Sequence, residues 1–435
     1  MFNITAGAPR AAANSQPMPL MQHDDFDLEP APVPAPSMAR RMLVDERRVV
    51  SGYQLVPSEG TPKTAGACFD DAGTAKSAES ATRLAKPTFI RCTCRDLMNG
   101  QLDRLDPKTV VLEIRDSTEG DLNDGASSGG LDETVLKEAR AKGFKLAFDA
   151  RLLKKEYAGF VSLASYIILE MGVMELDRAA ALARGIRSNT KAVPMAAQVR
   201  TSAEYETLAD AGVQMFEGHW YAQPPVKTDK SIQLSYAGLI KLLNMVMREA
   251  DSTEIEELLK HEPTLAYKLL RHINSVGFGS NIEITSFRHA VLTVGLKKLF
   301  RWTALLITNT PPGSVAPAAG TRAIVRGRLM ELLALETMSP ADADLAFVTG
   351  MFSMLDTLLG MPLEDALALV NLPKAITDAI LSGDGPFAQY LAIAKACEHT
   401  DEALLEILSV RNRIAASHMI DTHLQALAWA EQFGH

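Results

Sequence analysis

Hydrophobic positions follow two different patterns along the chain. From residue 39 to 226, short apolar runs such as TFIRCT, TVVLEI, KLAFDA and SYIILE alternate with amphipathic stretches such as DETVLKEARAKG. Short apolar runs predict buried strands, and the amphipathic stretches between them predict helices that cover the sheet. This many strand–helix units in succession predict a barrel built on a parallel sheet.

The pattern changes after a linker predicted at residues 227–235. From residue 236 to 435 the chain has helical periodicity and almost no strand signal. Thr253 and Glu256 form a capping-box pattern, and Pro263 stands where the first residue of a helix is expected. We therefore predict a multidomain fold, with an α/β barrel at 39–226 and an all-α domain at 236–435.

Two segments lack both patterns. Residues 1–38 are rich in Ala, Pro and Ser and have few large apolar residues, which predicts a disordered tail. Residues 57–86 interrupt the first domain with Gly, Ala, Ser and Thr, and we expect a polar loop with at most one weak helix. Neither segment is expected to contribute to a core.

Composition limits the classes of partner. The chain of 435 residues has a net charge of −9, which gives no electrostatic footprint for a nucleic-acid polymer. It has no export-signal pattern and no apolar stretch near the roughly 20 residues that span a bilayer. The four cysteines include no CxxC pair, so neither a zinc site nor a disulfide framework is expected. We predict a cytoplasmic protein without membrane insertion.

Two carboxylates stand where predicted strands end. Asp149 closes KLAFD ahead of ARLLKKEY, and Glu113 lies near the end of TVVLEI. In barrel proteins, functional groups lie at the ends of strands, so Asp149 could be a metal ligand. Asp149 could equally be the N-cap of the helix that follows, and Glu113 could pair with an arginine such as Arg91.

Several longer phrases resemble a known family. YKLLRHINSVGFG, EITSFRHAVLTVGLKKLFRW, AFVTGMFSMLDTLLGMPL and ALAWAEQF occur in this order. With them, residues 39–435 resemble the YuxH-type EAL–HDOD family of signalling proteins. The resemblance implies a degenerate TIM-like (β/α) barrel of the EAL type, as in cyclic-di-GMP phosphodiesterases, followed by a helical HDOD domain related to HD phosphohydrolases.

The resemblance also identifies the positions of the EAL site. Glu113 and Asp149 match acidic metal ligands of the family. Other residues replace the family's site residues at Gln54, Ser58, Arg91, Ala150, Ser165, Ile168, Glu170, Ala197, Arg200 and Glu217. Phosphodiester hydrolysis with two divalent metals needs several carboxylates around one water. We therefore predict no metal, no cofactor and no phosphodiesterase activity.

The helical domain gives a similar prediction. Where HD enzymes have an adjacent His-Asp pair, this chain has Ser353 and Met354. Serine and methionine do not suit a catalytic divalent metal. Nearby Asp356 is expected to be a polar helix position.

Two functional hypotheses follow. In the first, the chain is catalytically inactive and acts by binding other signalling proteins through its helical domain. In the alternative, the barrel is a non-hydrolysing receptor for cyclic-di-GMP, with Arg91 and Arg200 contacting the phosphates. Neither hypothesis makes the chain an enzyme.

Overall fold

The computed structural model describes residues 38–57, 86–98, 105–115, 130–222, 230–262, 265–267, 269, 295–308, 317–399 and 401–431. The predicted tail at 1–38 and the predicted loop at 57–86 fall outside these ranges except at their last or first residues. The same is true of most of the helix predicted to start at Pro263. Among the helices that the described residues form, none combines the length and the apolar character needed to cross a membrane.

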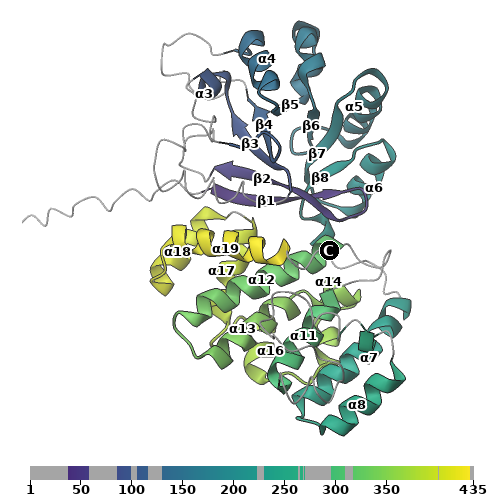
Figure 1. Cartoon of the computed structure of the whole chain (residues 1–435), viewed down its shortest axis with the longest axis vertical. Helices are drawn as coiled ribbons and strands as arrows, with labels where there is room; N and C mark the ends of the chain where they lie inside the picture. Colours follow the sequence, from purple (N-terminus) through teal and green to yellow (C-terminus); the bar gives the residue numbers. More distant parts are fainter. Residues whose placement is uncertain are drawn as a thin grey trace, which may run out of the picture. The chain divides into compact units, whose positions relative to one another are not determined.

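The first part of the chain forms a closed barrel (Figure 1). Its strands follow one another around the barrel in sequence order. They are β1 Met38–Asp45, β2 Val50–Pro57, β3 Thr88–Cys92, β4 Val110–Ile114, β5 Lys145–Asp149, β6 Tyr166–Glu170, β7 Val193–Val199 and β8 Met215–Gly218. The predicted fold class, a barrel followed by helices, is confirmed.

One strand runs against the others. β1 pairs antiparallel with β2 and with β8, whereas β2 to β8 pair in parallel. The turn between β1 and β2 is closed by Asp45, whose Oδ1 accepts the backbone N–H groups of Arg47 and Val49 at 2.9 Å. A connection this short can only reverse the chain, because a parallel pair needs a long crossover.

The inside of the barrel begins with an apolar layer. Seven strands contribute to this cluster, which consists of Leu43, Phe89, Val111, Ala147, Ile168, Met195, Ala197 and Met215. Side chains alternate between the two faces of a strand, so residues two positions further along also face the inside. At that next level, toward the carboxyl ends of β3 to β8, the residues are mostly charged.

Helices cover the outside of the barrel, and α4, α5 and α6 lie around it in Figure 1. On α4, Leu136 and Ala139 are buried, and Asp132 caps the helix by accepting the N–H groups of Thr134 and Val135. The helical segments of this part are α3 Cys94–Met98, α4 Glu133–Ala141, η1 Ala150–Leu153, η2 Lys155–Leu163, α5 Leu176–Asn189, α6 Ser202–Asp210 and η3 Trp220–Ala222.

The rest of the described chain is helical. α7 begins at Lys230, so part of the stretch predicted as a linker at 227–235 is helix. The helices are α7 Lys230–Met247, α8 Ser252–His261, α11 Leu296–Thr308, α12 Pro317–Leu335, α13 Pro340–Phe352, α14 Leu355–Leu359, α15 Leu363–Ala368, α16 Lys374–Leu381, α17 Ala388–His399, α18 Glu402–Asn412 and α19 Ala416–Ala430.

The start of α8 differs from the sequence prediction. Asp251, not Thr253, is the N-cap, and its carboxylate accepts the N–H of Thr253 at 2.7 Å. The predicted capping box is therefore wrong. Asp is as good an N-cap as Thr. Because Asp251 lies two residues before Thr253, α8 begins at Ser252.

Two glycines let α12 and α13 approach at backbone distance. A Cβ on Gly350 would lie 2.7 Å from the Cα of Gly327, and a Cβ on Gly327 would lie 2.7 Å from the carbonyl oxygen of Phe347. Neither contact involves the end of a flexible side chain, so the helices themselves would have to separate. The pair Gly327–Gly350 thus sets the spacing of these two helices.

We expect Gly350→Ala to lower the free energy of unfolding by about 2 kcal/mol, the usual range for overpacking a rigid contact. Gly185→Ala is the control, because nothing lies within 4 Å of a Cβ at this position in α5. A helical glycine with open space around its Cβ position should stabilise the protein by about 0.5 kcal/mol or more when it is replaced by alanine. Urea unfolding of the two variants and the parent measures both changes, and equal stability of the two variants would contradict the assignment.

Candidate functional site

Charged residues form the second layer inside the barrel. Each lies two residues beyond a member of the apolar layer, at or near the carboxyl end of its strand. In this way Arg91 follows Phe89, Glu113 follows Val111, Asp149 follows Ala147, Glu170 follows Ile168 and Glu217 follows Met215. Because these strands run in parallel, their carboxyl ends meet at the same end of the barrel. Five of the twelve EAL-site positions predicted from the sequence therefore come together there.

Glu113 is the buried centre of this layer, with a side chain that is 0% exposed. Its Oε1 accepts a hydrogen bond from Arg91 Nε at 2.9 Å, and its Oε2 accepts one from Gln54 Nε2 at 2.6 Å. The predicted pairing of Glu113 with an arginine is thus confirmed. A fully buried carboxylate needs such partners, because an unpaired buried charge is very costly.

Arg115 connects three carboxylates from three neighbouring strands. Its Nη2 lies 2.6 Å from Glu113 Oε1 and 2.6 Å from Glu170 Oε1, and its Nη1 lies 4.0 Å from Asp149 Oδ2. Sequence reasoning missed Arg115. The available signal was its position two residues after Glu113, which places both side chains on the same face where β4 ends.

Asp149 has two roles at the end of β5. Its Oδ1 accepts the backbone N–H of Arg151 at 2.8 Å and caps η1, which confirms the predicted N-cap, although the helix is 3₁₀ rather than α. Its Oδ2 also accepts from Arg151 Nη2 at 2.7 Å. Both carboxylate oxygens of Asp149 are therefore engaged by Arg151.

Burial and the neighbouring hydrogen-bond donors and charges act in opposite directions on the pKa values of Glu113 and Asp149. Burial alone would raise the pKa of Glu113, but Arg91, Arg115 and the hydrogen bond from Gln54 outweigh it and hold the pKa below its usual range. Burial would also raise the pKa of Asp149, and the hydrogen bonds and charge of Arg151 lower it on balance. Both residues are therefore anionic at neutral pH.

The remaining predicted positions are more scattered. Ile168 and Ala197 belong to the apolar layer, and Ala150 opens η1. Ser165 lies at the opposite end of β6, where its Oγ accepts from Arg140 Nη1 at 2.8 Å. Ser58 lies outside the described residues.

Two predicted positions lie around β7 and β8. Glu217 accepts the N–H of Gln198 at 2.9 Å and lies 3.6 Å from Arg41. The side chain of Arg200 is exposed, and its backbone N–H donates to Glu204 at 2.8 Å. The structure thus places Arg91 within the charged layer, whereas Arg200 belongs to the surface at the start of α6.

The divalent metals that an EAL-type barrel implies would need the carboxylate oxygens of this layer as ligands. Both oxygens of Glu113 and of Asp149 already accept hydrogen bonds from Gln54 or arginines, and Glu170 is held by Arg115. Within the described part of the chain, no group of three or more His, Cys, Asp or Glu side chains is arranged to hold a metal ion. The carboxylates in this arrangement therefore do not fit a metal pair.

The region of the helical part that corresponds to the HD site also contains a buried ion cluster. Ser353 is the C-cap of α13, and its Oγ accepts from Arg326 Nη1 at 2.6 Å and donates to the carbonyl of Gly350. Arg326 and Arg322 both contact the carboxylate of Glu398, at 2.6 and 2.8 Å. Burial would raise the pKa of Glu398, but the two arginines lower it strongly.

The other predicted residues of this region have structural positions. The side chain of Met354 is buried and belongs to the hydrophobic core. Asp356 lies in the first turn of α14, where its Oδ1 accepts the N–H of Thr357 at 2.7 Å. This contact agrees with its interpretation as a polar helix position.

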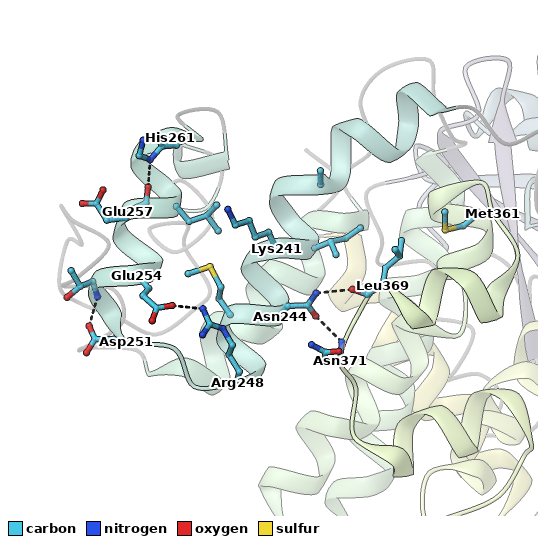
Figure 2. Close-up of a pocket in the computed structure, with 15 residues that line it drawn as sticks. Lys241, Asn244, Arg248, Asp251, Glu254, Glu257, His261, Met361, Leu369 and Asn371 are labelled. Atoms are coloured by element: carbon cyan, nitrogen blue, oxygen red, sulfur yellow. Dashed lines mark hydrogen bonds and ion pairs between the residues drawn. The ribbon is translucent and has the colours of Figure 1, made fainter.

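A groove opens on the helical part, beside α7 and α8 (Figure 2). Its volume is about 1170 Å³. Apolar lining residues include Ile240, Met245 and Leu258 from these helices and Leu369 from the end of α15. Charged residues line both helices, with Lys241 and Arg248 on or next to α7 and Asp251, Glu254 and Glu257 on or next to α8. Sequence analysis did not predict this groove.

Hydrogen bonds fix one wall of the groove. The Asn244 side chain donates to the carbonyl of Leu369 and accepts the N–H of Asn371, both at 2.9 Å. Arg248 and Glu254 form an ion pair between the end of α7 and α8, as Figure 2 shows. Within the described residues, Lys241 makes no ion pair, and its side chain is exposed.

Comparison with known proteins identifies the helical segment. Residues 236–358 match the HDOD domain. The chain is 24% identical over 376 residues to a Vibrio cholerae protein named cyclic di-GMP phosphodiesterase CdgJ, covering 84% of this chain and 85% of that protein. It is also 23% identical over 415 residues to the Bacillus subtilis uncharacterized protein YuxH, covering 90% of this chain and 97% of YuxH. The predicted resemblance to EAL–HDOD proteins is confirmed.

Solved structures of EAL proteins are more distant. A complex of Klebsiella pneumoniae BlrP1 with calcium and cyclic di-GMP is 18% identical, with a TM-score of 0.32, and the match covers 42% of this chain and 54% of that chain. An EAL domain protein from Listeria monocytogenes is 11% identical, with a TM-score of 0.34, and the match covers 47% of this chain and 93% of that one.

One prediction from the sequence is contradicted. We predicted that the chain is not an enzyme, because most EAL site positions and both HD positions are substituted. The similarity to CdgJ, a protein named as a phosphodiesterase, over 84% of the chain overturns this prediction. Counting substituted motif positions therefore does not establish that the chain is inactive.

The charged layer predicts a pH-dependent contribution to stability. Glu113→Gln removes the buried charge that Arg91 and Arg115 share, so we expect the free energy of unfolding at pH 7 to fall by about 3 kcal/mol. The pKa of Glu113 is lowered by folding, so its contribution is complete above the unfolded-state pKa and is lost as the pH falls through the folded-state pKa. The difference between variant and parent should therefore shrink below about pH 4.

Glu133→Gln is the control for this experiment. Glu133 is 54% exposed and pairs with Lys137 on the same helix, so its loss should change stability by less than about 0.5 kcal/mol. Urea unfolding from pH 3 to pH 8 measures both variants. A difference for Glu113→Gln that stays constant across this range would contradict the assigned charge state.

Proposed function

We propose that this chain is a cyclic-di-GMP-related signalling protein that acts on a partner protein through the groove beside α7 and α8. The observation that carries the proposal is the groove itself, an open cavity of about 1170 Å³ with apolar and charged lining residues, most of which lie in the segment 236–358 that matches the HDOD domain. Small-molecule pockets are usually closed clefts of about 300–1,000 Å³. An open groove between helices suits an amphipathic helix of another protein.

The charges of the groove indicate the chemistry of that helix. Arg248 and Glu254 neutralise each other, and Glu257 pairs with Lys260 at 2.8 Å. Lys241 also lines the groove and makes no ion pair among the described residues. The partner helix therefore carries an apolar stripe for Leu258, Met245 and Leu369 and an acidic residue that pairs with Lys241.

Site-specific photocrosslinking tests the groove. With a photoreactive amino acid at Leu369, which is 41% exposed, the full chain should crosslink to a partner through an acidic amphipathic helix of that partner. The control places the same group at Leu381, which is 48% exposed and not among the groove-lining residues. Mass spectrometry identifies the crosslinked peptides. Identical products from both positions, or none from Leu369, would refute the groove as the docking site.

Purified components then give the energetics. Lys241→Glu should weaken binding of the crosslinked partner by about tenfold or more, because it opposes the acidic residue of the partner helix. Charge reversal of that acidic residue should restore binding to Lys241→Glu. Unchanged affinity of Lys241→Glu would show that the partner does not use this charge.

A second function is favoured by the guanidinium groups in the barrel. Arg91 and Arg115 have side chains that are 26% and 21% exposed at the strand-end layer, so they are within reach of an anionic ligand. Arginine binds phosphate through paired hydrogen bonds. We propose that this end of the barrel binds cyclic di-GMP, which the names of CdgJ and of several structural relatives include.

Calorimetric titration with cyclic di-GMP, with and without magnesium, tests this proposal. We expect micromolar binding to the parent chain and a loss of at least tenfold in Arg91→Ala, which removes one phosphate donor. Arg140→Ala is the matched control, because Arg140 contacts Ser165 at the other end of β6. The titrated samples are also analysed for the linear dinucleotide, so that cleavage is measured together with binding. Absence of heat in every sample would exclude this second function.

A further inference from the structure

Helix α18 has an apolar stripe that faces solvent. Leu404, Ile407 and Val410 follow one another at intervals of three residues and are 37%, 63% and 80% exposed. This spacing places the three side chains along one side of the helix. Isolated exposed apolar residues are ordinary, but a continuous stripe marks an interaction surface.

The opposite side of α18 packs into the hydrophobic core of the helical part. Leu405 and Leu408 are buried, and α18 packs against α17 and α19, which lie beside it in Figure 1. The helix is also well terminated, because Asp401 caps its start by accepting the N–H of Leu404 at 3.0 Å. The stripe is therefore not needed to hold α18 in place.

Charges on α18 are distributed unequally along its length. Asp401 precedes the helix and Glu406 lies near its middle, whereas Arg411 and Arg413 lie at its end. No ion pair of these four side chains occurs within the part of the chain that the structure describes. Asp401 thus makes the start of the exposed surface acidic, Arg411 and Arg413 make its end basic, and Glu406 lies between them.

We propose that α18 is a dimerisation helix, and that the stripe binds the same stripe of a second copy in antiparallel orientation. In this orientation a twofold axis passes by Ile407, so Ile407 meets its equivalent and Leu404 meets Val410. The basic end of each helix then lies beside the acidic end of the other. A parallel pair would instead bring like charges together, so the charge distribution favours the antiparallel arrangement.

The size of the stripe limits the strength of the dimer. Specific interfaces usually bury about 1,200–2,000 Å² in total, and three side chains on a helix of 11 residues provide only part of this area. The dimer therefore forms at micromolar chain concentrations and separates on dilution. Sedimentation equilibrium on the full chain should show this concentration dependence.

Disulfide trapping tests the position of the axis. Ile407→Cys places the new thiols opposite each other, so mild oxidation should convert most of the full chain into a covalent dimer. Val173→Cys, at a position that is 83% exposed in the turn after β6, is the control and should give no covalent dimer under the same oxidation. This control also accounts for the native cysteines. Equal dimer yields from the two variants would overturn the proposed axis.

A double-mutant cycle with charged residues tests both the antiparallel orientation of the two helices and the identity of the partner as a second copy. In the antiparallel pair, position 411 faces position 403 of the other copy, where Ala403 is exposed. Ala403→Arg and Arg411→Glu should each weaken self-association about tenfold, and the double variant should recover to within about threefold of the parent. Far-UV circular dichroism verifies that each variant is folded.

The cycle also excludes the alternatives. Recovery in the double variant is not expected for a parallel pair, in which these positions do not meet. A parent chain that stays monomeric up to 200 µM, or a double variant weaker than both single variants, would refute self-pairing and leave the stripe to a different protein.

Discussion

A buried glutamate held between two arginines is the interaction on which both parts of this molecule depend. Glu113 has this environment in the barrel, and Glu398 and Glu331 have it among the helices. Their arginine partners are Arg91 and Arg115, Arg322 and Arg326, and Arg301 and Arg328, respectively. Removing one member of such a group leaves an uncompensated buried charge, which costs far more than a surface ion pair contributes. Long-range packing in each part is therefore fixed by groups that tolerate little displacement.

Much of the fold could be predicted from the sequence because its signals are local. The apolar runs that form β3 to β8 are short and continuous, and amphipathic helical segments separate them. This is the pattern of a parallel sheet that is buried on both faces. The antiparallel direction of β1 was not predicted, although the short turn at Asp45 requires it. The predicted start of α8 was also wrong, because the sequence offers two capping residues close together. Both Asp251 and Thr253 can cap a helix, and only the packed helix shows which one does so.

The site was predicted less completely than the fold. Alternation along the strands and the family resemblance together located Glu113, Asp149, Gln54 and Arg91 at the correct end of the barrel. They did not reveal Arg115, because it matches no motif position and its partners Glu113 and Glu170 come from different strands. The groove was missed for the same physical reason, since its walls join α7 and α8 to residues more than 100 positions away, as the contact between Asn244 and Leu369 shows. Contacts between distant segments leave no periodic trace in a sequence.

The guanidinium of Arg115 has a consequence for how the protein is made. A metal ion that balances three carboxylates must be delivered to each chain after synthesis, and its occupancy depends on the supply in the cell. Arg115 is part of the polypeptide, so every chain receives this positive charge in a one-to-one ratio as it leaves the ribosome. Arginine also keeps its charge at any physiological pH. Every folded chain therefore carries its own positive charge beside Glu113, Asp149 and Glu170.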